Sequence, residues 1–135
     1  MRFDEWVAKV PDSLKRDPVW GFAAYPKALL LADLAWEDSG KMLDDVRGKA
    51  VARQLIRGAG SVSANIDEGY GRGIDRAEYV QFLRFALGSA RESRSWYFKA
   101  RALLADEIVQ HRMNLCSEII ALLVTAIKNR KNSLR

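Results

Sequence analysis

The sequence contains one cysteine and one histidine among 135 residues, which limits the chemistry that its side chains can perform. A single cysteine, Cys116, cannot form an internal disulfide, and this is typical of a protein of the reducing cytoplasm. His111 precedes Cys116 by five residues, so on an ideal helix the two side chains point about 140° apart. No motif supplies the third oriented group that a metal site or a nucleophilic triad needs. We therefore expect no metal, no cofactor and a location in the cytoplasm.

Long apolar runs are also missing. The longest ones, residues 28–32 and 119–124, fall far below the roughly 20 residues that a membrane-spanning helix needs. The first residues show neither an uninterrupted apolar stretch nor a small-residue cleavage site, so no secretory signal is expected. The sequence therefore predicts no membrane partner.

The sequence also lacks the common motifs of enzymes. The glycine-rich residues 69–73 lack the Lys-Ser/Thr ending of a phosphate-binding loop and follow an expected helix instead of a strand. No pair of carboxylates is placed for acid–base chemistry, and Glu92 is interpreted as structural. We therefore expect a protein that is not an enzyme.

Helical periodicity, in contrast, is present over nearly the whole chain, with apolar side chains recurring every three or four residues. Four helices are expected, from residue 26 to a stop at 38–40, from about 45 to 68, from 75 to about 102, and from about 106 onward. Short connections favour an all-α, up-down-up-down antiparallel four-helix bundle over residues 25–131. Residues 1–24 are expected to form an N-terminal extension, and residues 132–135 a frayed tail.

The corner between the second and third helices carries polar and glycine residues that predict a structural motif. Asn65 and Glu68 lie within one helical turn of each other, and Glu68 could pair with Arg72 or another arginine. A hydrogen-bonded brace is the favoured interpretation, and a ligand site is the alternative. Gly69, followed by Tyr70, is expected to end the helix in a left-handed conformation.

The third helix is expected to begin at a capping box, in which Asp75 is followed three residues later by Glu78. Some large apolar side chains fall outside its main apolar stripe. They are Val80, Phe85, Trp96 and Phe98. We expect these side chains to face a neighbouring subunit.

Positive charge is concentrated in the middle of the chain. Residues 47–101 carry 11 basic and 5 acidic side chains, a net charge of +6, whereas residues 1–46 carry a net charge of −3. Two stripes of cations are predicted on the second and third helices: Lys49, Arg53 and Arg57 on the former, and Arg84, Arg91, Arg94 and Arg101 on the latter. Solvated helix faces, intersubunit ion pairs and sites for nucleic-acid phosphates all remain open interpretations.

Three segments of the sequence resemble a known family. They are Ser-Val-Ser-Ala-Asn-Ile-Asp-Glu-Gly-Tyr-Gly-Arg at 61–72, Glu-Tyr at 78–79, and Phe-Leu-Arg-Phe-Ala-Leu-Gly-Ser at 82–89. They closely resemble the four-helix-bundle proteins encoded in intervening sequences of 23S ribosomal RNA genes, and the resemblance extends over about residues 25–127.

That resemblance implies an oligomeric assembly and binding partners, which the spacing of residues in the sequence does not indicate by itself. Members of the family look like homopentamers. A related branch is the accessory variability determinant of diversity-generating retroelements, which binds nucleic acid and a reverse transcriptase. We therefore expect a non-catalytic oligomer that binds RNA or DNA through its basic helix faces. The alternative is a scaffold or adaptor that binds a protein partner and has no affinity for nucleic acid.

Overall fold

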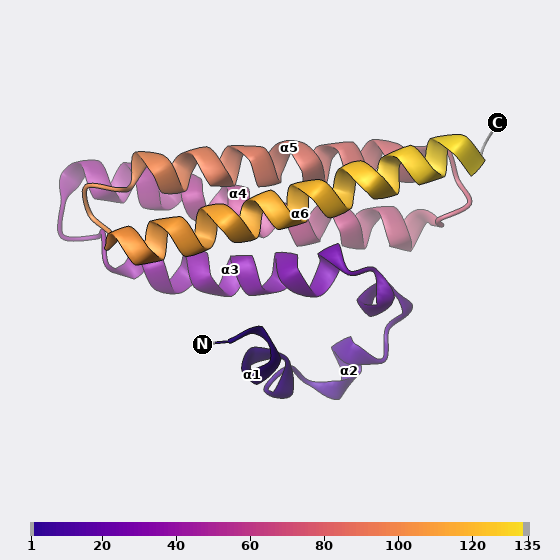
Figure 1. Ribbon diagram of the computed structural model, residues 1–135, viewed down its shortest axis with the longest axis horizontal. Helices are drawn as coiled ribbons and strands as arrows, with labels where there is room; N and C mark the ends of the chain where they lie inside the picture. Colours follow the sequence, from indigo (N-terminus) through magenta and orange to yellow (C-terminus); the bar gives the residue numbers. More distant parts are fainter. Residues whose placement is uncertain (1, 134–135) are drawn as a thin grey trace.

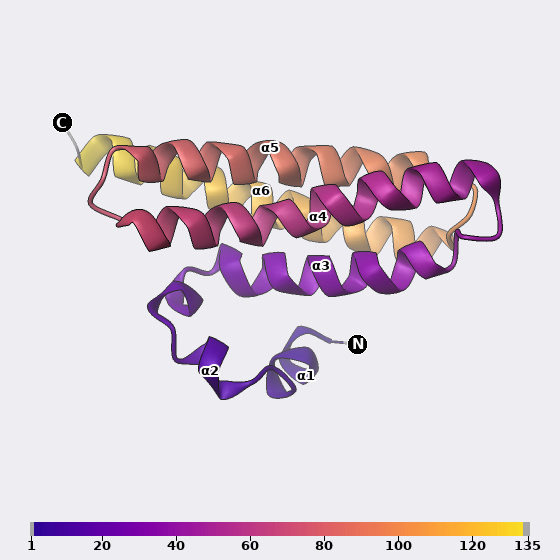
Figure 2. The same cartoon turned by 180° about the vertical axis from the view of Figure 1, so that it is seen from behind.

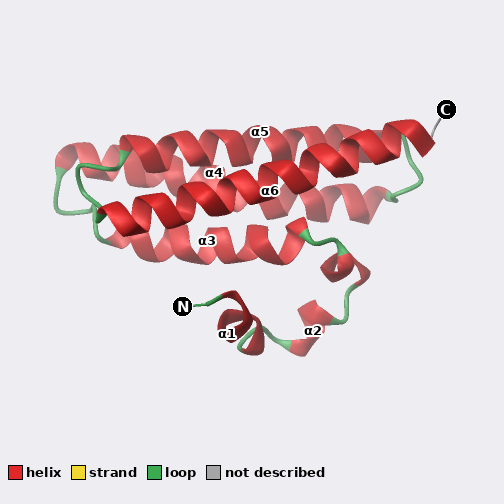
Figure 3. Ribbon diagram, viewed as in Figure 1, coloured by secondary structure: helices red, strands yellow, loops and turns green. Residues whose placement is uncertain are grey.

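The computed structural model describes residues 2–133, and every regular element within them is helical (Figure 3). The helices are α1 (Phe3–Ala8), α2 (Asp12–Lys15), the 3-10 helix η1 (Pro18–Gly21), α3 (Ala24–Gly40), α4 (Val46–Arg72), α5 (Glu78–Lys99) and α6 (Asp106–Ser133). The all-α class predicted from the sequence is confirmed. Within the described part of the chain, no helix is both long enough and apolar enough to cross a bilayer.

The four long helices lie side by side along the length of the molecule (Figures 1 and 2). Helix α4 packs against α3 and α5, and α6 packs against α5 and α3. The α3–α4 and α5–α6 connections lie at one end, and the α4–α5 connection and the last turns of α6 lie at the other (Figure 1). This arrangement gives each long helix one face toward a shared core.

The core is built from the apolar positions that recur every three or four residues. The spacing predicted for α4 is confirmed, because Leu55, Val62 and Ile66 are fully buried. Val80 is also buried in this core, so the expectation that it faces a neighbouring subunit is wrong. Burial of these faces is the main force that holds the helices together. Large, fully buried side chains come from all four long helices: Leu31, Leu55, Ile66, Leu83, Tyr97, Ile119 and Leu123.

Helix α4 begins where the sequence predicts and ends later. The Asp45 carboxylate accepts hydrogen bonds from the backbone N–H groups of Arg47 and Gly48, at 2.7 and 3.1 Å, and so caps the first turn. The prediction that Gly69 ends the helix in a left-handed conformation is wrong. The helix continues to Arg72, and the residue with positive φ is Gly73, at 114°.

Close packing between α4 and α5 explains the glycine at position 69. A Cβ atom there would lie 3.1 Å from both the Cβ of Phe82 and the Cδ1 of Tyr79. Its buried position under these rings requires a small residue but no special backbone angle. Sequence alone does not separate these two reasons for a glycine.

The other helix boundaries also differ from those expected. Helix α5 starts at Glu78 after an Ala77 that makes no side-chain capping bond, so the expected capping box does not form. It ends at Lys99, short of the expected end near 102. Helix α6 continues to Ser133 within the expected tail, of which residues 134–135 lie outside the described residues.

The N-terminal segment packs on the outside of α3. Trp6 is buried, and its indole Nε1 donates a 2.8 Å hydrogen bond to Asp33 Oδ2 on α3. Its ring also stacks on Trp20, with 6.4 Å between ring centroids. Both ribbon views show α1 and α2 on the α3 side of the molecule (Figures 1 and 2). This segment therefore packs mainly on α3, and η1 also contacts α4.

Two glycines of α4 provide a matched test of this packing. We expect Gly48→Ala to destabilise the fold by about 1–3 kcal/mol, because the added methyl group would overlap the carbonyl oxygen of Met42. Gly60 has no atom within 4 Å of the position of an added Cβ, so Gly60→Ala should stabilise the helix by about 0.5–1 kcal/mol. Urea denaturation measures both changes. Equal effects of the two substitutions would contradict the close contact between α4 and the α3–α4 turn.

Candidate functional site

The predicted cations of α4 are all accessible to solvent. Lys49, Arg53 and Arg57 are exposed, and within residues 2–133 none of their side chains forms an ion pair or hydrogen bond. Successive members are four residues apart, so the row turns by about 40° at each step around an ideal helix. These three side chains are therefore free to contact an anionic partner.

The predicted cations of α5 fall into different environments. Arg84 and Arg91 are exposed and have no ion-pair partner within the described residues. Arg94 is partly buried, and its Nη1 donates a 3.1 Å hydrogen bond to the Ser117 hydroxyl of α6, so it marks the seam between α5 and α6. Arg101 lies beyond the end of α5, which corrects the expected four-residue stripe.

The carboxylates of α5 turn toward α4. Glu78 pairs with Arg72 of α4 at 3.6 Å. Glu92 accepts a 3.1 Å hydrogen bond from Trp96 Nε1, and its Oε1 lies 4.0 Å from where a Cβ at Gly58 of α4 would stand. Both acidic groups are thus held on the side of α5 away from α6.

Beyond its first turn, α6 carries one carboxylate, and it is also turned away from the α5–α6 seam. Glu118 pairs with Lys27 of α3 at 2.9 Å, so it lies on the α3 side of its helix, about 100° around from Ser117. Asp106 and Glu107 belong to the first turn of α6, where the positive end of the helix dipole stabilises their negative charges. From the second turn of α6 onward, no carboxylate of the described chain lies along the seam with α5.

Cations of two helices therefore share one face. Arg84, Arg91 and Arg94 come from α5, and exposed Lys128 and Lys131 come from α6. The two lysines follow Ser117 by 11 and 14 residues. On an ideal helix, both side chains therefore point within about 40° of the direction of Ser117. These five residues are called the α5–α6 cationic face below. Its two lysines were not predicted from the sequence, because their position depends on how α6 packs.

The α4 row is not part of that face. Helix α5 covers α4 at Gly58, whose added Cβ would lie 3.1 Å from the Ser93 hydroxyl. Around an ideal helix, Lys49, Arg53 and Arg57 point about 100–180° away from that glycine. One subunit thus presents two separate basic surfaces.

The predicted corner motif is hydrogen-bonded within its own helix. Asn65 Nδ2 donates a 2.8 Å hydrogen bond to the Ser61 carbonyl oxygen, so the expected hydrogen bond forms within α4 and not across the corner. Arg72 pairs with Glu78 of α5, and no ion pair of Glu68 occurs within the described residues. The pairing of Glu68 with Arg72 considered from the sequence is therefore wrong.

Tyr70 completes the corner by an aromatic contact. Its ring stacks on Phe22, with 6.5 Å between centroids, and meets the edge of Tyr79 at 5.6 Å. The corner thus joins the segment before α3 to α4 and α5, which supports a structural role for the motif.

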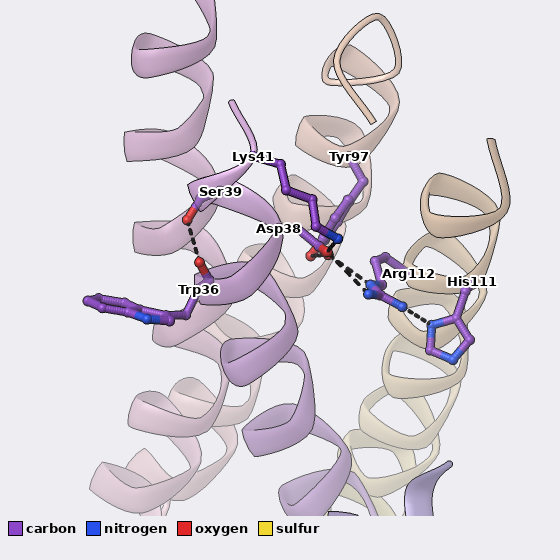
Figure 4. Close-up of polar contacts among 7 residues, drawn as sticks. All are labelled: Trp36, Asp38, Ser39, Lys41, Tyr97, His111 and Arg112. Carbon is purple, nitrogen blue, oxygen red and sulfur yellow. Dashed lines mark hydrogen bonds and ion pairs between the residues drawn. The ribbon is translucent and has the colours of Figure 1, made fainter. Parts of the chain in front are cut away.

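A polar cluster that the sequence did not predict lies at the other end of the molecule, where α3 ends (Figure 1). Figure 4 shows its side chains. Asp38, in the last turn of α3, is fully buried. Its Oδ2 accepts hydrogen bonds from Arg112 Nε of α6 and Tyr97 Oη of α5, both at 2.8 Å. Arg112 Nη2 donates to Oδ1 at 3.2 Å, and Lys41 Nζ lies 3.5 Å from the same oxygen. The cluster links three helices through one carboxylate.

The electrostatics of the cluster follow from its burial. Burial and the adjacent Asp38 charge raise the pKa of the Tyr97 phenol. Burial opposes the charge of Arg112, but its bonds to Asp38 outweigh that effect and raise the pKa of the guanidinium. Tyr97 therefore stays a neutral donor and Arg112 stays charged.

His111 extends this cluster toward the surface. Arg112 Nη1 donates to His111 Nδ1 at 2.8 Å, and because arginine can only donate, this imidazole nitrogen accepts. Burial and the nearby Arg112 charge lower the pKa of His111. The imidazole is therefore neutral at pH 7, with its proton on Nε2.

The sequence carried one signal for this cluster. Asp38 lies seven residues after Leu31 and four after Leu34, at the spacing of the buried face of α3. A carboxylate at such a position needs a cationic partner inside the fold. The interpretation of residues 38–40 as a helix stop alone therefore missed the second role of Asp38.

An apolar hollow opens between α3 and α4 near the same end of the molecule. It has a volume of about 200 Å³ and is lined by Trp36, Ser39, Gly40, Leu43 and Ile56. Trp36 is 74% exposed, and its ring points away from the Asp38 cluster (Figure 4). Such an exposed tryptophan is typical of a surface that binds another protein.

The single thiol offers little reactivity. Cys116 is buried, and burial raises the pKa of its thiol to about 12. Among the described residues, no three histidine, cysteine, aspartate or glutamate side chains converge in a way that could hold a metal ion.

Comparisons with known proteins add a family. The family model described as "23S rRNA-intervening sequence protein" matches residues 22–125, which run from the start of α3 into the last part of α6. A crystal structure of a protein of unknown function from the S23 ribosomal protein family of Bacteroides thetaiotaomicron is similar in fold, with a TM-score of 0.71 and 24% identity. The similarity covers 78% of this chain and 98% of the other. The search of curated proteins gave no match.

The Asp38 cluster predicts an unequal response to two substitutions. Asp38→Asn should destabilise the fold by about 3 kcal/mol, because it leaves the Arg112 charge largely buried without its counter-ion. Tyr97→Phe removes one hydrogen bond and should cost about 1 kcal/mol. Urea denaturation of the two variants gives the comparison. A smaller loss for Asp38→Asn than for Tyr97→Phe would show that the ion pair does not hold this end of the molecule.

Proposed function

The chain belongs to the 23S rRNA-intervening sequence protein family, and we propose that it is a non-catalytic, oligomeric protein that binds nucleic acid through its basic helix faces. The observation that carries this proposal is the α5–α6 cationic face, because Glu78, Glu92 and Glu118 of its two helices are turned toward α3 and α4. Cations without acidic neighbours attract phosphates more strongly than cations in mixed surfaces. The face is therefore suited to a phosphate backbone.

The proposed architecture is an up-down-up-down antiparallel four-helix bundle. Two contacts support opposite directions for α5 and α6: Arg94 meets Ser117 near the middle, and Arg130 lies over the Tyr79 ring at 5.6 Å. The alternation of connections between the two ends supports the same order for all four helices (Figure 1).

The proposed absence of catalysis is supported by how the reactive groups are used. Cys116 is buried with a raised thiol pKa, and Asp38 is engaged by Arg112 and Tyr97. His111 accepts a bond from Arg112 through one of its two nitrogens. No nucleophile among these groups therefore meets an oriented base. A reduced, buried thiol also favours the cytoplasm as the proposed location.

The proposed mode of binding is electrostatic and not sequence-specific. Lysine and arginine side chains that neutralise phosphates release condensed counterions, and this release supplies the binding free energy. Contacts to phosphates carry no sequence information by themselves. We expect RNA and DNA to bind with similar affinity and both to dissociate as salt rises.

A salt titration with matched variants tests this function. Each phosphate contact should contribute about 0.7–0.9 to the slope of log affinity against log salt. Replacing Arg84, Arg91 and Arg94 together with Gln should lower the slope by about 2 to 3, and replacing Lys49, Arg53 and Arg57 with Gln is the matched change on the other basic surface. Fluorescence anisotropy with a labelled oligonucleotide measures the slope, and circular dichroism checks that the helices remain.

Two outcomes would count against nucleic-acid binding. One is a wild-type protein that shifts neither RNA nor DNA at low salt. The other is an unchanged slope in both triple variants, which would make the cations solvated faces. A loss confined to the α4 variant would move the proposed site to the α4 row.

A protein-binding scaffold is the second candidate, favoured by the apolar hollow around Trp36. The occupant could be a second copy of the chain, as the family resemblance implies for a homopentamer, or a different protein such as a reverse transcriptase. Leu43 and Ile56 are also exposed beside this tryptophan, so the surface is apolar over several residues. Apolar surfaces of this kind are normally covered in an assembly.

The assembly is tested by light scattering at micromolar concentration. We expect a homo-oligomer, and specifically the pentamer that the family resemblance implies. Trp36→Ser should favour its dissociation. The control is Ile74→Ser, which alters an exposed apolar residue in the α4–α5 connection at the other end of the molecule. A wild-type protein that stays at 15.2 kDa contradicts the oligomer, and equal effects of the two substitutions remove Trp36 from the interface.

A further inference from the structure

The α5–α6 cationic face ends at an exposed aromatic ring. Phe98 follows Arg84 by 14 residues and Arg91 by 7, so all three lie within about 40° of one another around an ideal helix. The Phe98 side chain is 49% exposed although it is large and apolar. Cations and an open ring thus follow one line along about 21 Å of α5.

Arg101 adds a second planar group at this end. Its guanidinium carbon lies 4.1 Å from the centroid of the Phe98 ring, and its Nη1 donates a 3.1 Å hydrogen bond to the Phe98 carbonyl oxygen. The backbone bond holds the guanidinium over the ring. Aromatic rings and guanidinium planes are both surfaces on which nucleobases stack.

Phosphate binding alone does not explain an exposed ring among cations. A duplex keeps its bases stacked inside and presents phosphates, which need only charge. A single strand presents unstacked bases next to its phosphates, and stacking on an aromatic ring then adds affinity with little dependence on sequence. The combination of charge and open ring fits the second kind of ligand.

We propose that the α5–α6 cationic face binds single-stranded nucleic acid, with phosphates along Arg91 and Arg84. One base stacks on the Phe98–Arg101 pair, in place of the neighbouring subunit that the sequence led us to expect at Phe98. This inference rests on the proposed nucleic-acid function and specifies its substrate class. Charge complementarity selects the polyanion, and the ring selects the unpaired strand over the duplex.

Two other aromatic residues of α5 are differently placed. Trp96 bonds to Glu92 through its Nε1, and Lys99 Nζ lies 4.2 Å from the centroid of its ring. Phe85 is 47% exposed, but it lies about 140° around the helix from Phe98 and meets Phe82 edge-on at 5.8 Å. Phe85 is therefore a matched control: equally exposed, equally large and outside the proposed face.

Binding of a 20-nucleotide oligothymidylate and of the corresponding thymidine–adenine duplex, each fluorescently labelled, tests the proposal on the full chain. We expect Phe98→Ala and Phe98→Leu to weaken binding of the single strand about tenfold, with an unchanged salt slope. Phe98→Tyr, which keeps the ring, should retain wild-type affinity, as should Phe85→Ala. Binding of the duplex should change less than about twofold in all four variants, since no base is free to stack.

Several results would overturn this inference, and one of them also overturns the proposed function. The stacking site alone is overturned if Phe98→Ala binds the single strand as tightly as the wild-type protein does. It is also overturned if Phe85→Ala weakens this binding as much as Phe98→Ala does. Equal weakening of duplex and single strand overturns the proposed selectivity. If the wild-type protein binds neither nucleic acid at low salt, the proposed nucleic-acid function is overturned together with this inference.

Discussion

The arrangement of the long helices depends on one buried carboxylate. Asp38 lies at the C-terminal end of α3, where the helix dipole disfavours a negative charge, and it is fully removed from water. It is tolerable there only because Arg112 approaches with two parallel bonds and Tyr97 donates a third. These directional contacts set the positions of α3, α5 and α6 relative to one another, which apolar packing alone defines less sharply.

The placement of carboxylates also determines where positive charge is exposed on the surface. Beyond the first turn of α6, the acidic side chains of α5 and α6 face α3 and α4, as with Glu118 on Lys27 and Glu78 on Arg72. The cations of the α5–α6 cationic face have no carboxylate partner within the described residues. The basic character of residues 47–101 is therefore not spread evenly, and it is completed by lysines of α6 that lie outside that segment.

Sequence periodicity was sufficient for the class of fold and for the buried faces, because burial at positions such as Leu55 and Ile66 follows directly from the 3.6-residue repeat. It was insufficient where a residue has two physical roles. Gly69 serves close packing, whereas Gly73 supplies the positive φ, and only the position of α5 separates them. Asp38 likewise fits both a helix end and a buried ion pair. Which cations share a face depends on partner helices, so the sequence predicted individual residues but not the surface they form.

The central claim is that the α5–α6 cationic face is where nucleic acid binds. A crystal structure of the full chain with an oligothymidylate tests it most directly, because it places phosphates and bases relative to individual side chains. We expect phosphates within hydrogen-bond distance of Arg84 and Arg91 and a base against Phe98. A strand that instead follows Arg53 and Arg57 on α4, or lies in the hollow beside Trp36, would contradict it.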